Sequence, residues 1–269
     1  MSVHVYAVNL DIAKDRWAFI ERAFAPTRLT LCRVPAVNGR ALQFPVADYS
    51  ESGFRWMHGR GTNPAEVGCY LSHIKAMEMF LQTEEPHALI CEDDVLIHPA
   101  FEEVLEAALK YSRHWNILRL TGLSTGNPVR VAPLCGDYGL CVNFGRLKGA
   151  GMYLIDRAAA RAFVSRLVPM KLPFDHAVDR EWFYGLRAAC VLPFPCSQTG
   201  SGLRTSIQNG GAPKLSPLHR WLGTFPYQAF NETARFLFRA VNCIRWMLAP
   251  KRETPLYPAG NPPGVLAKL

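Results

Sequence analysis

The chain has 269 residues, a hydrophobic fraction of 49% and a formal net charge of +8. This size and apolar content allow one large α/β domain or two small ones, and they exclude a chain that is disordered throughout. The charge is uneven, because residues 203–269 hold nine Lys/Arg and two Asp/Glu, a net of +7, which leaves +1 on the rest. A nearly neutral body argues against a nucleic-acid-binding protein, whose basic residues would line the folded binding face.

The first residues run directly into a strand-like segment, without the basic start and cleavage site of a secretory signal. No apolar run is long enough to predict a membrane-spanning helix. The eight cysteines are scattered and form no Cys-x-x-Cys pair, which disfavours a structural zinc site and is typical of buried thiols in a reducing cytoplasm. We therefore expect a cytoplasmic protein.

Strand-like and helical segments alternate along the chain. Buried apolar runs predict strands over 3–8, 29–34, 88–91, 115–120, 140–144, 151–155 and 188–194. Spacing and capping residues predict helices over 11–24, 63–82, 98–111, from 156 onward and over 175–185. Residues 121–137 are rich in Gly and Pro and are predicted to be an ordered loop. This order predicts a mostly parallel, doubly wound sheet flanked by helices.

Three adjacent carboxylates, Glu92, Asp93 and Asp94, follow the apolar run that ends at Cys91. Ligands of open α/β sheets bind outside the carboxyl ends of strands, and carboxylate oxygens suit Mg²⁺ or Mn²⁺. In an extended chain Glu92 and Asp94 point to the same side, so we expect them to bind the metal, with Asp94 as the first choice. The alternative is a solvated acidic loop without a ligand.

Several segments together resemble glycosyltransferase family 25, the bacterial lipopolysaccharide and lipooligosaccharide galactosyltransferases. They are the stretch Asn-Pro-Ala-Glu-Val-Gly-Cys-Tyr-Leu-Ser-His over 63–73, Cys-Glu-Asp-Asp over 91–94, Gly-Ala-Gly-Met-Tyr-Leu-Ile-Asp over 149–156 and Leu-Pro-Phe-Asp over 172–175. The resemblance covers roughly residues 3–207. It implies a GT-A-like (Rossmann-like) fold, a UDP-sugar donor, usually UDP-galactose, Mn²⁺ or Mg²⁺, and inversion at the anomeric carbon.

The resemblance also implies a set of donor-binding residues. They are expected at Asn9, Arg16, Asn38, His73, Lys75, Asp93 and Gln198. A guanidinium can bind a diphosphate with two parallel hydrogen bonds, and a lysine can neutralise phosphate charge. Structural alternatives stay open for most of them, namely a buried core histidine at 73, solvated surface cations at 16 and 75, and a plain turn at 38–39.

An inverting transferase needs one general base near the acceptor hydroxyl. The family pattern points to Asp175, and Asp179 on the same helical face is the second choice. Asp175 is also predicted to be the N-cap of its helix, a role that is compatible with catalysis.

The basic C-terminal part predicts an amphipathic helix over 230–248. Its polar face holds Asn231, Arg235, Arg239 and Asn242, and its opposite face holds Ala234, Leu237, Phe238, Val241, Ile244 and Leu248. We expect a catalytic domain over 1–207 and an extension over 208–269 that contacts an anionic membrane surface. The alternative is a helix that packs on the catalytic domain or on a second subunit.

The sequence therefore predicts a metal-dependent, inverting hexosyltransferase that moves galactose from a UDP-sugar to a lipid-linked oligosaccharide acceptor, at the inner face of the bacterial inner membrane. Glucose or an N-acetylhexosamine remain alternative sugars. A non-catalytic partner of envelope assembly is a further alternative, against which the intact acidic cluster argues. A phosphohydrolase would need additional metal-binding Asp/His pairs.

Overall fold

The structure, a computed structural model, describes residues 3–198 and 212–248. The strands in this part of the chain are β1 (His4–Asn9), β2 (Thr30–Pro35), β3 (His87–Glu92), β4 (Val95–Ile97), β5 (Ile117–Arg119), β6 (Pro128–Pro133), β7 (Gly139–Asn143), β8 (Met152–Asp156), β9 (Ala188–Leu192) and β10 (Cys196–Gln198). The helices are α1 (Lys14–Phe24), α2 (Glu51–His58), α3 (Pro64–Leu81), α4 (Phe101–Leu109), α5 (Arg157–Arg166), α6 (Phe174–Val178), α7 (Pro217–His219) and α8 (Phe225–Leu248). Short helical turns are η1 (Gly39–Ala41), η2 (Ser112–His114), η3 (Glu181–Tyr184) and η5 (Arg220–Thr224).

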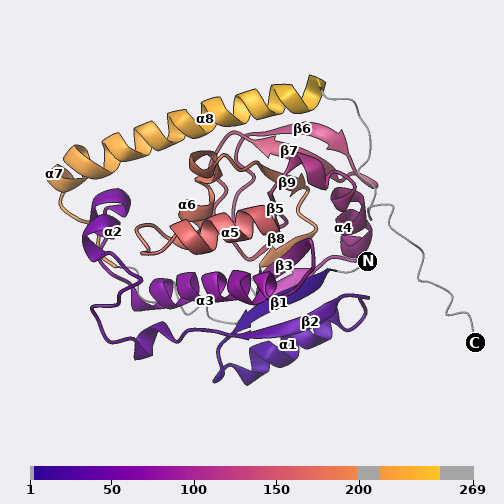
Figure 1. The fold of residues 1–269 in the computed structure, drawn as a ribbon, viewed down its shortest axis with the longest axis horizontal. Helices are drawn as coiled ribbons and strands as arrows, with labels where there is room; N and C mark the ends of the chain where they lie inside the picture. Colours follow the sequence, from indigo (N-terminus) through magenta and orange to yellow (C-terminus); the bar gives the residue numbers. More distant parts are fainter. Residues whose placement is uncertain (1–2, 199–211, 249–269) are drawn as a thin grey trace, which may run out of the picture.

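The described residues form one large sheet with the strand order β2-β1-β3-β8-β5-β9-β7-β6 (Figure 1). Strands β7 and β8 run opposite to the other six, so the sheet is mixed but mostly parallel. β4 and β10 pair separately as a short antiparallel ribbon. The predicted α/β class, with a mostly parallel sheet flanked by helices, is confirmed.

Helices cover both faces of this sheet. One apolar core lies between the sheet and α3, α5 and α6, with Tyr70, Phe80 and Phe163 fully buried. The other lies under α1 and α4, where Ile20 and Phe101 are buried. Because every central strand is covered on both sides, the strands read as continuous apolar runs, which is why sequence alone located most of them.

The two best helix predictions came from capping residues, and both are confirmed. The side chain of Asn63 accepts a hydrogen bond from the backbone N–H of Ala65, with Pro64 in the first turn of α3. Asp156 accepts from the N–H of Ala159 at 2.7 Å and begins α5. These caps satisfy N–H groups that the first turn of a helix leaves unpaired.

Other elements differ from the predictions. The expected loop over 121–137 contains β6, an edge strand that begins and ends with proline, where a missing N–H costs no ladder bond. Helix α2 was not predicted, although Ser50 caps its start and Gly59 ends it in the left-handed conformation. The helix expected over 175–185 is two pieces, α6 and η3. Asp175 is not its N-cap, since Pro173 holds that position.

The C-terminal helix lies on the body of the protein along β6, β7 and η3. It is amphipathic as predicted, but it is its polar face that is buried: Asn231, Arg235 and Arg239 are at most 6% exposed. Leu237 and Ile244, on the apolar face, are mostly exposed. In the described part of the chain, α8 therefore packs on the body through its polar face. The boundary predicted between residues 207 and 208 lies outside the described residues.

Candidate active site

The three carboxylates, residues 92–94, lie where β3 ends and the chain turns toward β4. This segment is here called the acidic turn. Neighbouring strand β1 runs parallel to β3 and ends at Asn9, and β2 runs parallel to β1 and ends at Pro35. The side chains that follow these strands therefore meet at one edge of the sheet, where open α/β folds bind ligands.

Asp93 and Asp94 face the start of α1. Asp93 accepts a hydrogen bond from Asn9 Nδ2 at 2.6 Å and forms an ion pair with Arg16. The same guanidinium donates from Nη2 to Oδ2 of Asp94 at 2.8 Å. Both carboxylates are buried. Asn9 and Arg16 thus belong to the acidic turn itself, and in this structure they hold its shape.

Glu92 contacts residues of α3 and β10. Its Oε2 accepts from Gln198 Nε2 at 3.3 Å, and its Oε1 lies 3.8 Å from Nε2 of His73. Gln198 lies close against Gly151, where a Cβ atom would come within 2.6 Å of the Gln198 amide carbon. Gln198 therefore lies at the acidic turn as the sequence predicted, and the glycine makes room for it.

Burial first, and then the negative charge of Glu92, raises the pKa of Asp94 to about 7, although Arg16 opposes the shift. A buried carboxylate whose ionisation is opposed by a neighbouring negative charge is a place where a divalent cation is stabilised. The oxygen donors of Glu92 and Asp94 fit Mg²⁺ or Mn²⁺. Among the described residues, Cys69, His73 and Glu92 form another group whose ligand atoms lie within 4.8 Å of one another. That softer set suits zinc better.

His73 is fully buried and stacks on the ring of Phe174 at 4.2 Å between centroids. Its Nδ1 lies 3.1 Å from the hydroxyl of Tyr153. The structural alternative, a core histidine, therefore describes its environment. Its remaining nitrogen points toward Glu92, so His73 can orient that carboxylate, but it has no exposed edge with which to bind a phosphate.

Asp175 belongs to the same site. Its Oδ2 accepts from the backbone N–H of Gly149 at 2.9 Å, and its Oδ1 accepts from the N–H of His176. Gly149 adopts a positive φ of 79° and lies next to Gln198. Burial, and then the charges of Glu92 and Asp175, raise the pKa of the Cys69 thiol. Asp175 is only partly buried, so an acceptor hydroxyl can reach it.

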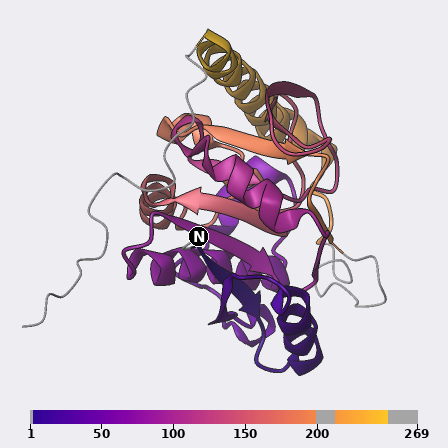
Figure 2. The same cartoon turned by 90° about the vertical axis from the view of Figure 1, so that its right-hand side faces the viewer.

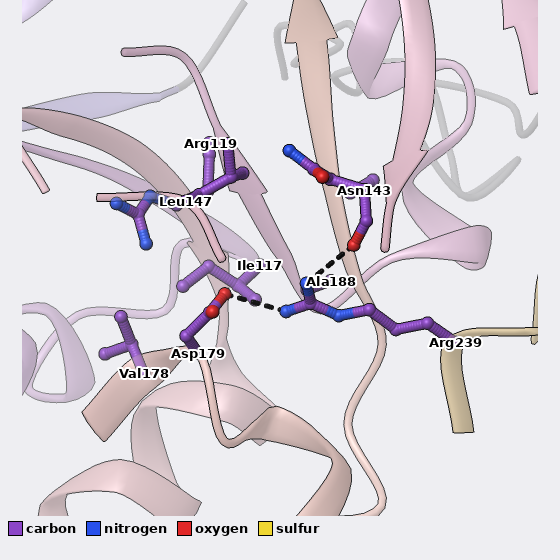
Figure 3. A pocket seen from close by; sticks show the side chains of 9 residues that line it. Ile117, Arg119, Asn143, Leu147, Val178, Asp179, Ala188 and Arg239 are labelled. Atoms are coloured by element: carbon purple, nitrogen blue, oxygen red, sulfur yellow. Dashed lines mark hydrogen bonds and ion pairs between the residues drawn. The ribbon is translucent and has the colours of Figure 1, made fainter. Parts of the chain in front are cut away.

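The structure argues against Asp179, the second candidate for the general base. Asp179 is buried, and it receives a hydrogen bond from Arg239 at 2.8 Å (Figure 3). Arg235 donates a second one at 3.0 Å. Burial alone would raise the pKa of Asp179, but these two cations outweigh it and hold the pKa below its usual range. A carboxylate so strongly stabilised in its charged form, and closed off from solvent, cannot take a proton from a substrate. Asp179 is a structural residue.

The remaining predicted donor residues lie at the end of β2. Asn38 caps η1, accepting from the N–H of Arg40. Lys75 donates to the carbonyl oxygen of Pro35 at 2.8 Å. Neither contacts the acidic turn, and both lie along the same edge of the sheet, two strands away from β3. This separation leaves room for an extended ligand across the ends of β2, β1 and β3.

Sequence reasoning missed two neighbours of the site, Cys69 and Tyr153. Cys69 lies one helical turn before His73, so the i, i+4 spacing on α3 contained the signal. Tyr153 contacts His73 only because β8 inserts antiparallel beside β3. No local pattern indicates that pairing.

The sequence similarity to known proteins covers the part of the chain that contains the acidic turn. Residues 2–128 match the family described as glycosyltransferase family 25 (LPS biosynthesis protein). A glycosyltransferase 25 family member of Drosophila pseudoobscura pseudoobscura is 30% identical over 118 residues, which are 41% of this chain and 18% of the relative. One of Anopheles gambiae is 26% identical over 125 residues, 43% of this chain and 21% of the relative. The chain thus spans about a fifth of the length of these curated relatives.

Two solved structures are similar at a low level. A glycosyltransferase involved in the glycosylation of the major capsid of PBCV-1 has a TM-score of 0.36 and 10% identity, covering 71% of this chain and 82% of its own. The inositol-1-phosphate CTP transferase of T. maritima has a TM-score of 0.40 and 11% identity, covering 87% and 97%. The matched region 2–128 contains the acidic turn, Asn9, Arg16 and α3, so over these residues the chain is similar to glycosyltransferase family 25, as its motifs predict.

Proposed function

We propose that this protein transfers a hexose, most simply galactose, from a UDP-sugar to the core of a lipooligosaccharide or lipopolysaccharide, with inversion at the anomeric carbon. The observation that carries the proposal is the acidic turn at the end of β3, with Gln198 beside it and Asp175 bound to Gly149, which lies next to Gln198. The matched family is described by its role in LPS biosynthesis, which supports a lipid-linked sugar acceptor.

Glu92 and Asp94 are the residues that would hold Mn²⁺ or Mg²⁺. When bound, such a cation offsets the charge of a diphosphate leaving group. The raised pKa of Asp94 supports the assignment, because the buried carboxylates lack enough positive charge from the protein alone. Asp93 keeps the turn in place through Asn9 and Arg16.

The donor would extend along the carboxyl ends of β3, β1 and β2. The diphosphate would lie near the acidic turn, where Arg16 is the nearest cation, and the uridine would lie toward Asn38 and Lys75. To bind phosphate, Arg16 would exchange part of its contact with Asp94 for the ligand. A guanidinium has enough donors to bridge both groups.

Asp175 would remove the proton from the acceptor hydroxyl. Its two carboxylate oxygens are oriented by the backbone N–H groups of Gly149 and His176, and no described cation forms an ion pair with it. This contrast with the buried, doubly paired Asp179 selects between the two candidates. An oriented carboxylate at the edge of the donor site is the arrangement that general-base catalysis requires.

A panel of UDP-sugars, with and without Mn²⁺, tests this function by the release of UDP. We expect release from UDP-galactose that stops on addition of EDTA and on the substitution Asp94→Ala. Preference for UDP-glucose or a UDP-N-acetylhexosamine would change the donor and keep the mechanism. Turnover that survives both EDTA and Asp94→Ala would refute the metal assignment. No UDP release from any donor, with a lipooligosaccharide acceptor present, would favour a non-catalytic role in envelope assembly.

A further inference from the structure

The outward side of α7–α8 is a continuous apolar surface. Its exposed side chains, here called the outer face, are Leu218, Trp221, Leu222, Phe225, Phe230, Phe236, Leu237, Val241, Ile244, Met247 and Leu248. Trp221 is 70% exposed and Leu248 is 80% exposed. Helix α8 alone has 24 residues, a length of about 36 Å. Apolar surface on this scale marks a site of interaction in a protein that is otherwise well packed.

The outer face cannot turn inward to join the core. Arg235 and Arg239 anchor the opposite side of α8 to Asp179 and Glu181, and Arg239 also donates to the carbonyl oxygen of Asn143 at 2.7 Å. Rotating the helix would break these buried ion pairs, and burying charge without its partner is costly. The apolar side chains are therefore presented to the outside by the fold itself.

The charged residues at the two ends of α7–α8 indicate which kind of surface the outer face binds. Lys214 and Arg220 lie at the start of this helical segment and Arg245 near its end, and none of the three forms an ion pair with a carboxylate in the described part of the chain. The outer face contains no acidic residue. A second copy of the chain would bring the same basic ends and a net charge of +8 against this surface, which disfavours self-association. An anionic lipid surface matches both the apolar face and its basic ends.

A basic cleft of about 260 Å³ opens beside the outer face. It is lined by Arg60, Lys214 and Arg220, together with His58 and His176. His176 directly follows Asp175, the proposed base. The cleft therefore lies between the start of the α7–α8 segment and the residue next to the proposed base.

We propose that the outer face of α7–α8 inserts into the interface of an anionic membrane. The lipid-linked acceptor named in the proposed function would then enter through the basic cleft. The cleft's role rests on that function, whereas membrane contact follows from the outer face and its basic ends alone. Aromatic side chains such as Trp221 and Phe225 favour the boundary between headgroups and acyl chains. None of the described helices is long and apolar enough to cross a bilayer. In this proposal, α7–α8 lies in the plane of the membrane surface.

Co-sedimentation with vesicles tests the proposal, comparing phosphatidylcholine with mixtures of phosphatidylcholine and phosphatidylglycerol. The full chain should bind the anionic vesicles, and binding should weaken as salt is raised, because part of the attraction is electrostatic. The double variant Leu237→Glu/Ile244→Glu should lower the partition coefficient by at least about tenfold, since both side chains leave the apolar phase.

Ile12→Glu is the matched control. Ile12 is 81% exposed, compared with 59% for Leu237 and 57% for Ile244. It precedes α1, at the opposite end of the molecule from α8 (Figure 2). This variant should bind vesicles as the wild type does. Thermal unfolding of all variants verifies that each is folded.

The proposal fails if the wild type ignores anionic vesicles, or if the double variant binds them as well as the wild type. It also fails if sedimentation shows a dimer that the double variant dissociates while vesicle binding is absent, because the outer face would then be a self-association surface. Vesicle binding is measured without a UDP-sugar. Failure of the transferase assay alone would therefore leave the membrane surface standing and overturn only the proposed function.

Discussion

Arg239 on α8 donates from Nη2 to Oδ1 of Asp179 at 2.8 Å, and both side chains are at most 4% exposed. The same guanidinium donates from Nε to Glu181 at 2.6 Å. Asp179 and Glu181 connect α6 to η3, immediately after the segment that holds Asp175. The C-terminal helix is thus joined through charge to the element that carries the proposed base.

Removing Arg239 should destabilise the protein strongly. Arg239→Met keeps the length of the side chain but leaves Asp179 and Glu181 as buried carboxylates with less compensation, which typically costs about 3–5 kcal/mol. Urea unfolding at neutral pH measures the loss. The control is Arg245→Met, on the exposed side of the same helix, which should change the free energy of unfolding by no more than about 0.5 kcal/mol. Equal effects of the two substitutions would show that the buried ion pairs do not hold α8.

The substitution Asp175→Asn should abolish most of the sugar transfer without weakening the binding of the UDP-sugar. The amide keeps the hydrogen bonds from Gly149 and His176 possible on one side but cannot accept a proton, so kcat should fall by about 10²-fold or more. The KM for the UDP-sugar should remain close to that of the wild type. Initial rates of UDP release in the presence of acceptor measure both constants. Asp137→Asn, on the exposed turn before β7, is the control. A variant that retained the wild-type kcat would remove Asp175 from the mechanism.

Binding of Mn²⁺ should depend on pH in the range set by Asp94. With a pKa of about 7, Asp94 is largely protonated in mildly acidic solution, and a cation must displace that proton. Affinity should therefore rise by up to about tenfold per pH unit below neutrality and level off above it. Titration of Mn²⁺ by electron paramagnetic resonance measures the profile. Asp94→Asn should weaken binding and flatten the profile, and Asp15→Asn, on the exposed start of α1, should leave both unchanged. A profile that Asp94→Asn does not alter would contradict the assignment.

Stability should fall as the solution is acidified through the histidine range. Burial, and then the neighbouring His176, lowers the pKa of His58 to about 3 from its model-peptide value of 6.5. Between these values the unfolded chain takes up a proton that the folded protein does not. The free energy of unfolding therefore decreases as pH falls from 6.5 toward 3, by up to about 1.4 kcal/mol per pH unit for this group.

Urea unfolding at several pH values measures this slope. His58→Gln should reduce it, because glutamine does not titrate. His176, whose pKa burial also lowers, should contribute a smaller part in the same direction. If the slope in this range is the same in the wild type and in His58→Gln, the burial of a neutral His58 is not what links stability to pH.

Much of this architecture could be predicted from local patterns. The strands of the central sheet are buried on both faces, so they stand out as apolar runs, and α3 and α5 are marked by Asn63 and Asp156. The acidic turn could be found because three carboxylates after a buried strand are chemically unusual. Gln198 could be placed from its position in the family pattern.

What could not be predicted depends on partners distant in sequence. The polar side of α8 is buried because Asp179 and Glu181, about 60 residues earlier, supply the opposite charges. An amphipathic pattern reveals that a helix has two sides but not which one a protein covers. The same pairing removed Asp179 from the candidate bases, although its spacing from Asp175 was correct for one helical face. Short strands such as β4 and β10 pair only with each other and have no pattern of their own.

Because α8 is attached through its charged side, its apolar side does not have to hold the helix on the protein. In most surface helices the apolar side serves this purpose. Attachment to the body depends largely on a few buried arginines, whereas most of the outward apolar side chains lie outside the buried core. Exchange of one outward side chain for another therefore carries little cost in folding. Selection can therefore change the outward side chains of α8 without altering the residues that attach the helix.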